Sequence, residues 1–398
     1  MKVLLKALLV FTLGLIAVGA TGVLRASEQE LRGTGDLGIV IERATGSLLI
    51  VDTTGRKTLS RVEGLGDLSH ASAVFSRDQR YAFVFGRDGG LTKVDLLTGS
   101  IAGRVVQAGN SIGGAISDDG TLVAVSNYEP GGVRVFDAAT LAPVADIPAA
   151  WPGGLSKTIG LVDAPGRRFV FTLWDAGETW IADFSKGAAP CIITKLEGIG
   201  ANPYDALITA DGRYYVAGLY GEDGLSLVDL WDDTVKPRRI LDNYGRGDEK
   251  LPVYKMPHLE GWALAGDRFV LPAVGRHEVL FVDTRSFAEV GRTKVHGQPV
   301  FAVARPDGRH VWVNFAHPFN DTIQVIDSRT AEVVKEWKPG PAVLHMEFTA
   351  RGHEVWVSVR DANAVHVYDA RTFEKKAEIA ATSPSGIFFT SRAHRTGL

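Results

Sequence analysis

Two histidines occupy equivalent places in a repeated sequence pattern. His70 opens the stretch HASAVFSRDQRYAFV, and His258 opens HLEGWALAGDRFV further along the chain. Two imidazoles that face one channel from different sides are suited to binding iron or to transferring protons. The alternative is that both are polar loop residues with ordinary hydrogen-bonded partners.

Three further side chains have the chemistry to hold a flat, anionic ligand. Arg87 lies in the tight turn Gly86-Arg87-Asp88-Gly89-Gly90, and arginine can grip a carboxylate through two parallel hydrogen bonds. Tyr128 and Trp174 can stack on a flat ligand, although aromatic residues of this kind are more often packed between structural elements.

Composition and cysteine content exclude several function classes. The chain has 398 residues, with 45% hydrophobic and 22% charged residues and a net charge of −3, so it is an ordinary globular sequence with no global electrostatic case for binding nucleic acid. Its one cysteine is Cys191, which rules out an internal disulfide, a CxxC zinc site and a CxxCH attachment of haem c.

The first 26 residues have the order of a secretory signal peptide. Lys2 and Lys6 precede an apolar run of about 14 residues that ends in small residues, whereas a membrane span needs roughly 20. We therefore expect export to the periplasm, with cleavage near residues 20–26. Retention of this segment as an anchor is the alternative. No cysteine lies near the cleavage region, so a lipid anchor is not expected.

An apolar strand that ends in aspartate recurs through the rest of the chain. Successive aspartates are 42 to 54 residues apart, and each is followed by turn residues. The eight positions are Asp52, Asp95, Asp137, Asp183, Asp229, Asp283, Asp327 and Asp369. Four short strands at a period near 44 predict an all-β fold, an eight-bladed β-propeller.

The leftover strand at the C-terminus predicts how the ring closes. Residues 385–390 have no blade of their own, and we expect them to form the innermost strand of the blade that contains residues 38–62. The predicted organisation is a signal peptide at 1–26, a flexible lead-in at 27–35 and the propeller at 36–398.

The phase of the repeat predicts which loops meet at one mouth of the channel. These are the loops that enter each innermost strand and the loops between second and third strands. The entering loops hold His70, Ser111, Tyr204, His258 and His345. The other loops add Arg43, Arg87, Asn127, Tyr128, Glu129, Trp174, Asp175, Tyr220, Glu222, Arg276, His277, Asn314, His317, Arg360 and Asp361.

The block from His70 to Asp95 resembles the haem d1-binding propeller of cytochrome cd1 nitrite reductases. The resemblance implies that His70 is the axial ligand of the haem iron and that Arg87 contacts haem carboxylates. His258 matches the segment that supplies a distal histidine. The reductases carry a second distal histidine before a proline; the nearest match here is Arg305-Pro306, so Arg305 is the candidate contact at that place.

Over its whole length the chain resembles the NirF family of periplasmic proteins, which are required for haem d1 biogenesis. This resemblance implies non-covalent binding of haem d1 or its dihydro precursor. Nitrite reduction itself is not expected, since no haem c can be attached. The implied partners are the tetrapyrrole, the nitrite reductase and other haem d1 biogenesis proteins, and a homodimer is left open.

Three functions remain open at this stage. An enzyme would modify the precursor, for example by dehydrogenation, with His258, Glu129 or Asp175 as general base. A carrier would bind the haem and deliver it to the nitrite reductase without catalysis. A propeller that makes only protein contacts, without a cofactor, is the third.

Overall fold

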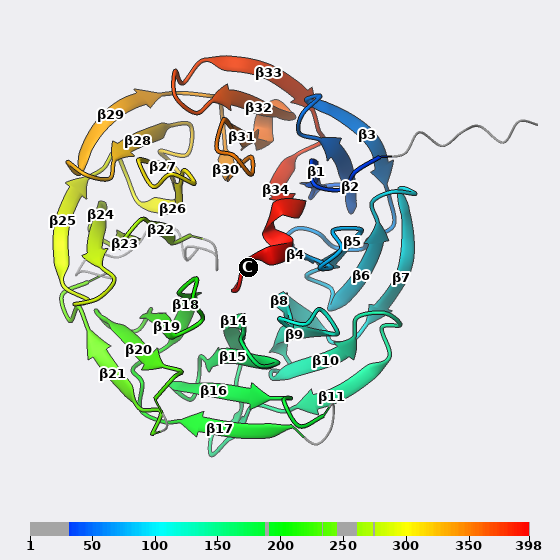
Figure 1. Ribbon diagram of the computed structural model, residues 1–398, viewed down its shortest axis with the longest axis vertical. Coiled ribbons are helices and arrows are strands. Elements are labelled where there is room, and N and C mark those ends of the chain that lie inside the picture. The colour runs from blue at the N-terminus through cyan, green and yellow to red at the C-terminus, as the bar shows by residue number, and fades with distance from the viewer. Residues whose placement is uncertain (1–31, 188–190, 233, 245–260, 274, 398) are drawn as a thin grey trace, which may run out of the picture. The chain divides into compact units, whose positions relative to one another are not determined.

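The protein is a ring of β-sheets around a central axis (Figure 1), and a cavity lies at its centre. The computed structural model describes residues 32–187, 191–232, 234–244, 261–273 and 275–397. Within these ranges, eight four-stranded antiparallel sheets form the blades. The predicted eight-bladed propeller is therefore confirmed. The predicted signal peptide and most of the lead-in lie outside the described residues.

Each blade runs from an innermost strand at the channel to an outermost strand at the rim, and we number the blades from the ring closure. Blade 1 contains β34 (Pro384–Phe389), β1 (Leu37–Glu42), β2 (Ser47–Asp52) and β3 (Lys57–Val62), and blade 2 contains β4 (Ser72–Phe75), β5 (Tyr81–Phe85), β6 (Gly90–Asp95) and β7 (Ser100–Val106). Blade 3 contains β8 (Asn110–Ile116), β9 (Leu122–Glu129), β10 (Val133–Asp137) and β11 (Pro143–Ile147), and blade 4 contains β14 (Thr158–Ala164), β15 (Arg168–Leu173), β16 (Glu178–Asp183) and β17 (Ile192–Leu196).

The second half of the ring repeats this arrangement. Blade 5 contains β18 (Pro203–Ile208), β19 (Tyr214–Leu219), β20 (Leu225–Asp229) and β21 (Pro237–Ile240), and blade 6 contains β22 (Ala263–Ala265), β23 (Arg268–Ala273), β24 (Glu278–Asp283) and β25 (Glu289–Lys294). Blade 7 contains β26 (Pro299–Ala304), β27 (His310–Phe315), β28 (Ile323–Asp327) and β29 (Glu332–Trp337), and blade 8 contains β30 (Val343–Phe348), β31 (Glu354–Val359), β32 (Ala364–Asp369) and β33 (Lys375–Ala380). The remaining elements are the hairpin β12 (Ala150–Trp151) with β13 (Gly154–Leu155) and the 3₁₀ turns η1 (Arg360–Ala362) and η2 (Thr390–His394).

The inner strands are apolar on both faces because each blade is covered by two neighbours. In blade 1, Ile39 and Ile41 pack with residues of blade 2, whereas the intervening Val40 packs with Trp356 of blade 8. Successive side chains of a strand point to opposite faces, so an unbroken apolar run serves both interfaces. The outermost strands are exposed instead, as in β29.

The recurring aspartates hold the turns that follow the third strands. The carboxylate of Asp137 accepts hydrogen bonds from the backbone N–H groups of Ala139 and Thr140, at 3.0 and 2.8 Å. Asp369 does the same for Arg371 and Thr372. Aspartate is favoured at such turns because its short side chain reaches the next backbone amides.

The C-terminal strand closes the ring, as the sequence predicted. β34 pairs with β1 in antiparallel register, with Ile39 opposite Phe388. Beyond β34 the chain continues as η2 towards the centre of the ring (Figure 1). The guanidinium of Arg392 forms a buried ion pair with Glu347 of β30, and the N–H of Gly397 donates to Asp163 of β14 at 2.8 Å. The C-terminal segment is thereby tied to blades 4 and 8.

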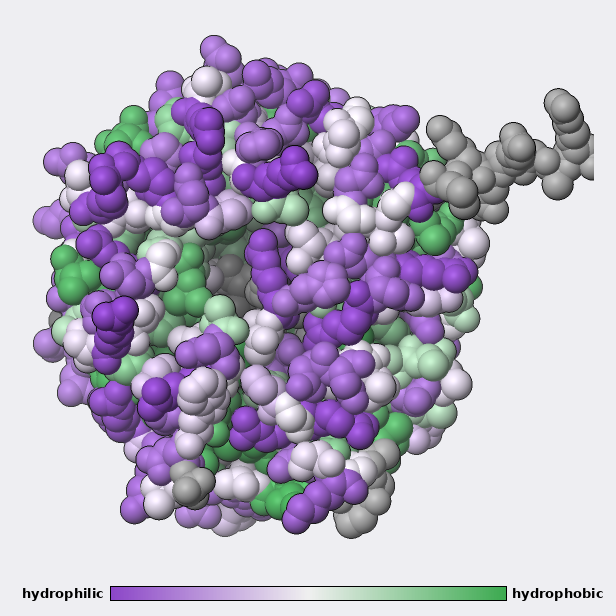
Figure 2. Space-filling view, viewed as in Figure 1, coloured by the Kyte–Doolittle hydropathy of each residue, from purple (hydrophilic) through white to green (hydrophobic). Residues whose placement is uncertain are grey.

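Among the described residues, no helix is long and apolar enough to span a membrane. The face drawn in Figure 2 is largely hydrophilic and is hollowed at the centre, where hydrophobic side chains form part of the wall.

Candidate functional site in the central channel

Irregularities at the starts of the innermost strands turn side chains into the channel. In blade 5, Pro203 pairs with Leu219 but Ala206 pairs with Ala217, so two residues of β18, Tyr204 and Asp205, oppose one residue of β19. A bulge of this kind bends the strand and re-aims its side chains.

The same shift recurs in four other blades, namely blades 1, 4, 7 and 8. It places the pair Val300–Phe301 in blade 7 and the pair Leu344–His345 in blade 8. All of these residues line one cavity at the centre of the ring.

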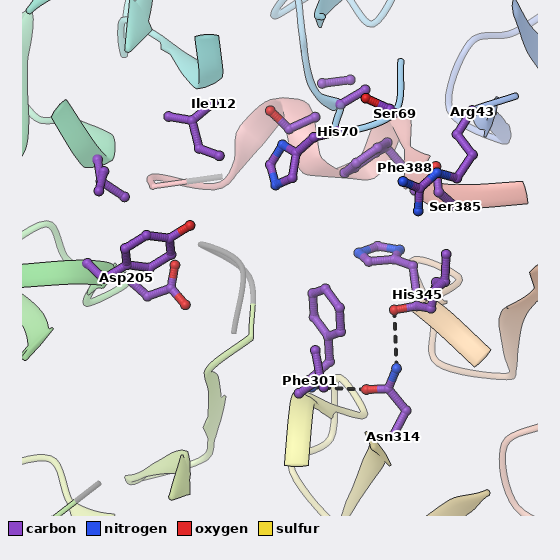
Figure 3. A pocket seen from close by; sticks show the side chains of 18 of the residues that line it. Arg43, Ser69, His70, Ile112, Asp205, Phe301, Asn314, His345, Ser385 and Phe388 are labelled. Carbon is purple, nitrogen blue, oxygen red and sulfur yellow. Dashed lines mark hydrogen bonds between the residues drawn. The ribbon is translucent and has the colours of Figure 1, made fainter. Parts of the chain in front are cut away.

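Polar side chains of the second strands satisfy the backbone groups that the bulges leave unpaired. Asn314 of β27 accepts a hydrogen bond from the N–H of Phe301 at 2.9 Å and donates to the carbonyl oxygens of Val343 and Leu344, both at 3.1 Å. This amide joins blades 7 and 8 at the cavity wall (Figure 3). Buried backbone groups need such partners, so Asn314 fixes the shape of the site.

The cavity extends along the channel and holds about 1670 Å³ of empty space, including solvent at its open end. Its wall is mainly apolar, with residues such as Ile112, Leu161 and Phe301. Gly397 of the C-terminal segment also lines it. An apolar cavity with a few convergent polar groups is the usual form of a small-molecule site.

Two histidines from neighbouring parts of the ring point into this cavity (Figure 3). His70 is half-buried in the segment before β4, and His345 is buried on β30. Nδ1 of His345 accepts a hydrogen bond from the N–H of Ile387 at 3.1 Å. His345 is also in ring contact with Phe301 and Phe388.

Arginines form a cationic rim on one side of the cavity. Arg43 and Arg360 both line it, from the loops of blades 1 and 8. Burial, and secondly the positive charge of Arg360, lower the pKa of Arg43, while the carboxylates of Asp67 and Asp361 partly offset this. The charge of the exposed Arg87 in blade 2 also acts on Arg43. Clustered guanidinium groups favour an anionic ligand at this rim.

Tyr128 and Trp174 belong to an aromatic cluster on the other side of the channel. The hydroxyl groups of Tyr128 and Tyr204 are 2.7 Å apart, and Trp174 packs against the rings of Tyr204 and Tyr220. Burial raises the pKa of both Tyr128 and Tyr204. Of these four aromatic residues, Tyr204 lines the cavity. Tyr128 and Trp174 therefore hold Tyr204 in position from behind the cavity wall.

Besides Arg87, Tyr128 and Trp174, the cavity wall does not include three other residues that were predicted to act at the site. Glu129 is exposed at the end of β9, and Asp175 is exposed and accepts a hydrogen bond from the N–H of Lys157 at 2.9 Å. Arg305 is buried in the turn after β26, where it donates to the carbonyl oxygen of Gly352 at 3.1 Å.

His258 lies outside the described residues. A histidine that precedes a proline does line the cavity, but it is His317, in the loop between β27 and β28, whereas the sequence comparison pointed to Arg305-Pro306.

Sequence reasoning missed Asp205, which is buried against the cavity. A signal for it exists, because Pro203, Pro299 and Pro384 each open an innermost strand. The second residue after each of these prolines (Asp205, Phe301 and Gly386) lies at the cavity.

The sequence matches known proteins along most of the chain. Residues 32–393 match the family described as Cytochrome D1 heme domain. Protein NirF of Stutzerimonas stutzeri is 60% identical over 96% of this chain and 99% of its own length. The chain belongs to the NirF family.

More distant relatives share the propeller. The dihydro-heme d1 dehydrogenase of Pseudomonas aeruginosa is 28% identical, over 88% of this chain and 70% of its own. A solved structure of the dihydro-heme d1 dehydrogenase NirN in complex with DHE superposes with a TM-score of 0.79 at 26% identity, over 92% of this chain and 78% of that one.

Proposed function

We propose that this protein acts in haem d1 biosynthesis by binding a late precursor, dihydro-haem d1 or a close relative, in the channel cavity. The observation that carries the proposal is the placement of His70, an apolar wall and the rim arginines around one cavity. A tetrapyrrole substrate presents the complementary features, namely an iron that takes an axial imidazole, flat apolar faces and peripheral carboxylates. The likeness to NirN in complex with DHE supports this choice of ligand.

Each group of residues has a separate role in this proposal. His70 supplies the axial nitrogen for the substrate iron, since neutral imidazole is a common ligand of iron. Arg43 and Arg360, with Arg87 beside them, hold the carboxylates. Phe301 and the apolar wall exclude water from the faces of the ring.

The test is an anaerobic absorbance titration of the protein with haem d1 and with dihydro-haem d1. We expect a saturable shift of the Soret band with at least one of them, and its loss in His70→Ala. His353→Ala is the matched control, because His353 is exposed in the turn before β31. Absence of any shift with both ligands would remove the proposed function and favour a propeller that makes protein contacts alone.

Enzyme and carrier are separated by the fate of the bound precursor. Dehydrogenation removes two electrons and two protons, so dihydro-haem d1 is incubated with the protein and an added electron acceptor. Conversion to haem d1 above the rate without protein means an enzyme. Recovery of unchanged ligand, together with transfer of haem d1 to haem-free nitrite reductase, means a carrier.

The place of action that we propose is the periplasm, from the signal peptide expected at residues 1–26. Fractionation of cells that produce the full chain tests this, with the periplasmic fraction as the expected location.

A further inference from the structure

The carboxyl group of Asp205 is a buried polar group at the cavity to which the proposed function has so far assigned no role. The residue is 2% exposed, and its Oδ2 atom is buried without a hydrogen-bond partner in the part of the chain that the structure describes. The bulge in β18 brings it to the wall, and Figure 3 shows its carboxyl group beside the open space. A buried polar atom without a partner is costly, and one at a cavity is readily explained by a ligand.

The surroundings of Asp205 hold the acid in its neutral form. Burial raises the pKa of Asp205 well above its ordinary value, and no described cation offsets this. The titratable groups whose pKa values respond to its charge are phenols: Tyr128 of β9, Tyr204 of β18, Tyr215 of β19, and Tyr244 beyond β21. A neutral carboxylic acid is a hydrogen-bond donor, whereas a carboxylate only accepts.

The polar groups of the cavity are unevenly distributed around the ring. Arg43 and Arg360 line the cavity from blades 1 and 8. Asp205 lies in blade 5, across the channel from Arg43 (Figure 3). A bound tetrapyrrole whose carboxylates contact the two arginines therefore directs its opposite edge towards Asp205. An acceptor oxygen on that edge would receive the proton of the acid.

Resting on the tetrapyrrole binding proposed above, we propose that Asp205 is a specificity-determining hydrogen-bond donor to a carbonyl oxygen on the tetrapyrrole edge opposite the carboxylates that Arg43 and Arg360 bind. The residue thus selects a tetrapyrrole whose ring has been oxidised to carry a carbonyl group. Protohaem has vinyl and methyl groups at the edge opposite its propionates, so it leaves the acid without a partner. A site built to hydrogen-bond a substrate discriminates strongly against an analogue that lacks the group.

The first experiment compares affinities for haem d1 and protohaem in the full chain and in Asp205→Leu and Asp205→Asn. We expect Asp205→Leu to weaken haem d1 binding about tenfold or more and to leave protohaem binding within about twofold, since one buried hydrogen bond separates the two ligands. Asp205→Asn, whose amide can donate, should retain most of the affinity. Equal effects of Asp205→Leu on both ligands, or none on either, would overturn the inference.

A second experiment needs no ligand and covers the case in which Asp205→Leu fails to fold. Infrared spectra of the free protein at neutral pH should contain the C=O stretch of a protonated carboxylic acid, and Asp205→Asn should lack it. Absence of this difference would overturn the inference.

A third measurement follows haem d1 affinity as the pH is raised. The affinity of the full chain should fall as Asp205 ionises, while that of Asp205→Asn should not. Parallel profiles would count against the inference. Failure of the unaltered protein to bind any tetrapyrrole would instead overturn the proposed function, and this inference with it.

Discussion

The backbone N–H of Ile387 donates a hydrogen bond to Nδ1 of His345, across the interface between blades 1 and 8. A backbone nitrogen can only donate, so Nδ1 accepts and the neutral ring carries its proton on Nε2. Histidines that ligate a metal usually show the reverse pattern and donate through their second nitrogen. The contact therefore makes His345 a hydrogen-bond donor, which agrees with the proposal that His70 is the axial ligand.

The first prediction separates these two histidines. In His70→Ala the iron-dependent Soret shift on binding haem d1 should disappear. In His345→Ala the shift should keep its shape while the affinity falls about tenfold, as expected for one lost hydrogen bond to a charged or polar ligand group. Absorbance titration measures both, with His353→Ala as control. Loss of the axial-ligand signature in His345→Ala would exchange the two roles.

The second prediction concerns the arginine rim. Arg43→Ala and Arg360→Ala should each weaken binding of haem d1 about tenfold, because a hydrogen bond to a charged group contributes roughly 1.5–3 kcal/mol. The loss should shrink at high salt, since both arginines are partly open to solvent and their charges are partly screened. Arg371→Ala removes an exposed arginine from the turn after β32 and should bind normally. If binding did not depend on salt and Arg43→Ala did not weaken it, the carboxylates of haem d1 would not bind at the arginine rim.

The fold was predictable because its signal is periodic and local. Each repeat ends a buried strand with an aspartate such as Asp137, whose side chain holds the next turn, so spacing alone counts the blades. The unmatched strand near Ile387 then had one place to pair, beside β1. Both properties follow from backbone hydrogen bonding and turn chemistry, which short stretches of sequence encode.

The site was less predictable because its geometry depends on β-bulges, which break the regular alternation of side chains along the innermost strands. Strict alternation along β18 cannot bring both Tyr204 and Asp205 to the cavity, and the bulge does so by inserting one extra residue. Repeat phase did group His70, His345 and Arg43, and all three line the cavity. It also suggested Asp175, whose carboxylate instead holds the backbone of Lys157.

The third prediction tests the support of these bulges. Asn314→Ala removes three hydrogen bonds, one from the N–H of Phe301 and two to carbonyl oxygens of blade 8. The net contribution of one hydrogen bond is about 1 kcal/mol, so the loss of three should lower the free energy of unfolding by about 3 kcal/mol. Asn320→Ala, which removes another amide of the cavity wall, should cost less than about 1 kcal/mol. Chemical denaturation measures both, and equal costs would show that Asn314 has no special role.

The fourth prediction is a pH dependence centred on the carboxyl of Asp163, to which the C-terminal segment is tied. Burial raises its pKa from the ordinary 3.8 to about 6, although the N–H of Gly397 and the charge of Arg77, 3.5 Å away, oppose the shift. The native state therefore binds a proton more tightly than the unfolded chain does. The contribution of Asp163 to the free energy of unfolding is most favourable below about pH 4 and declines as the pH rises to about 6.

The variant Asp163→Asn removes this titration and keeps an oxygen that can accept from Gly397. We compare the free energy of unfolding of Asp163→Asn with that of the unaltered protein. The difference, variant minus unaltered, should increase by about 3 kcal/mol from about pH 4 to about pH 6 and stay constant at higher pH. Denaturation curves for both proteins across this range measure the difference, in which contributions from other buried acids cancel. Parallel pH profiles would mean that Asp163 has an ordinary pKa in the folded protein, and that the C-terminal segment is held by a carboxylate that solvent and Arg77 keep ionised.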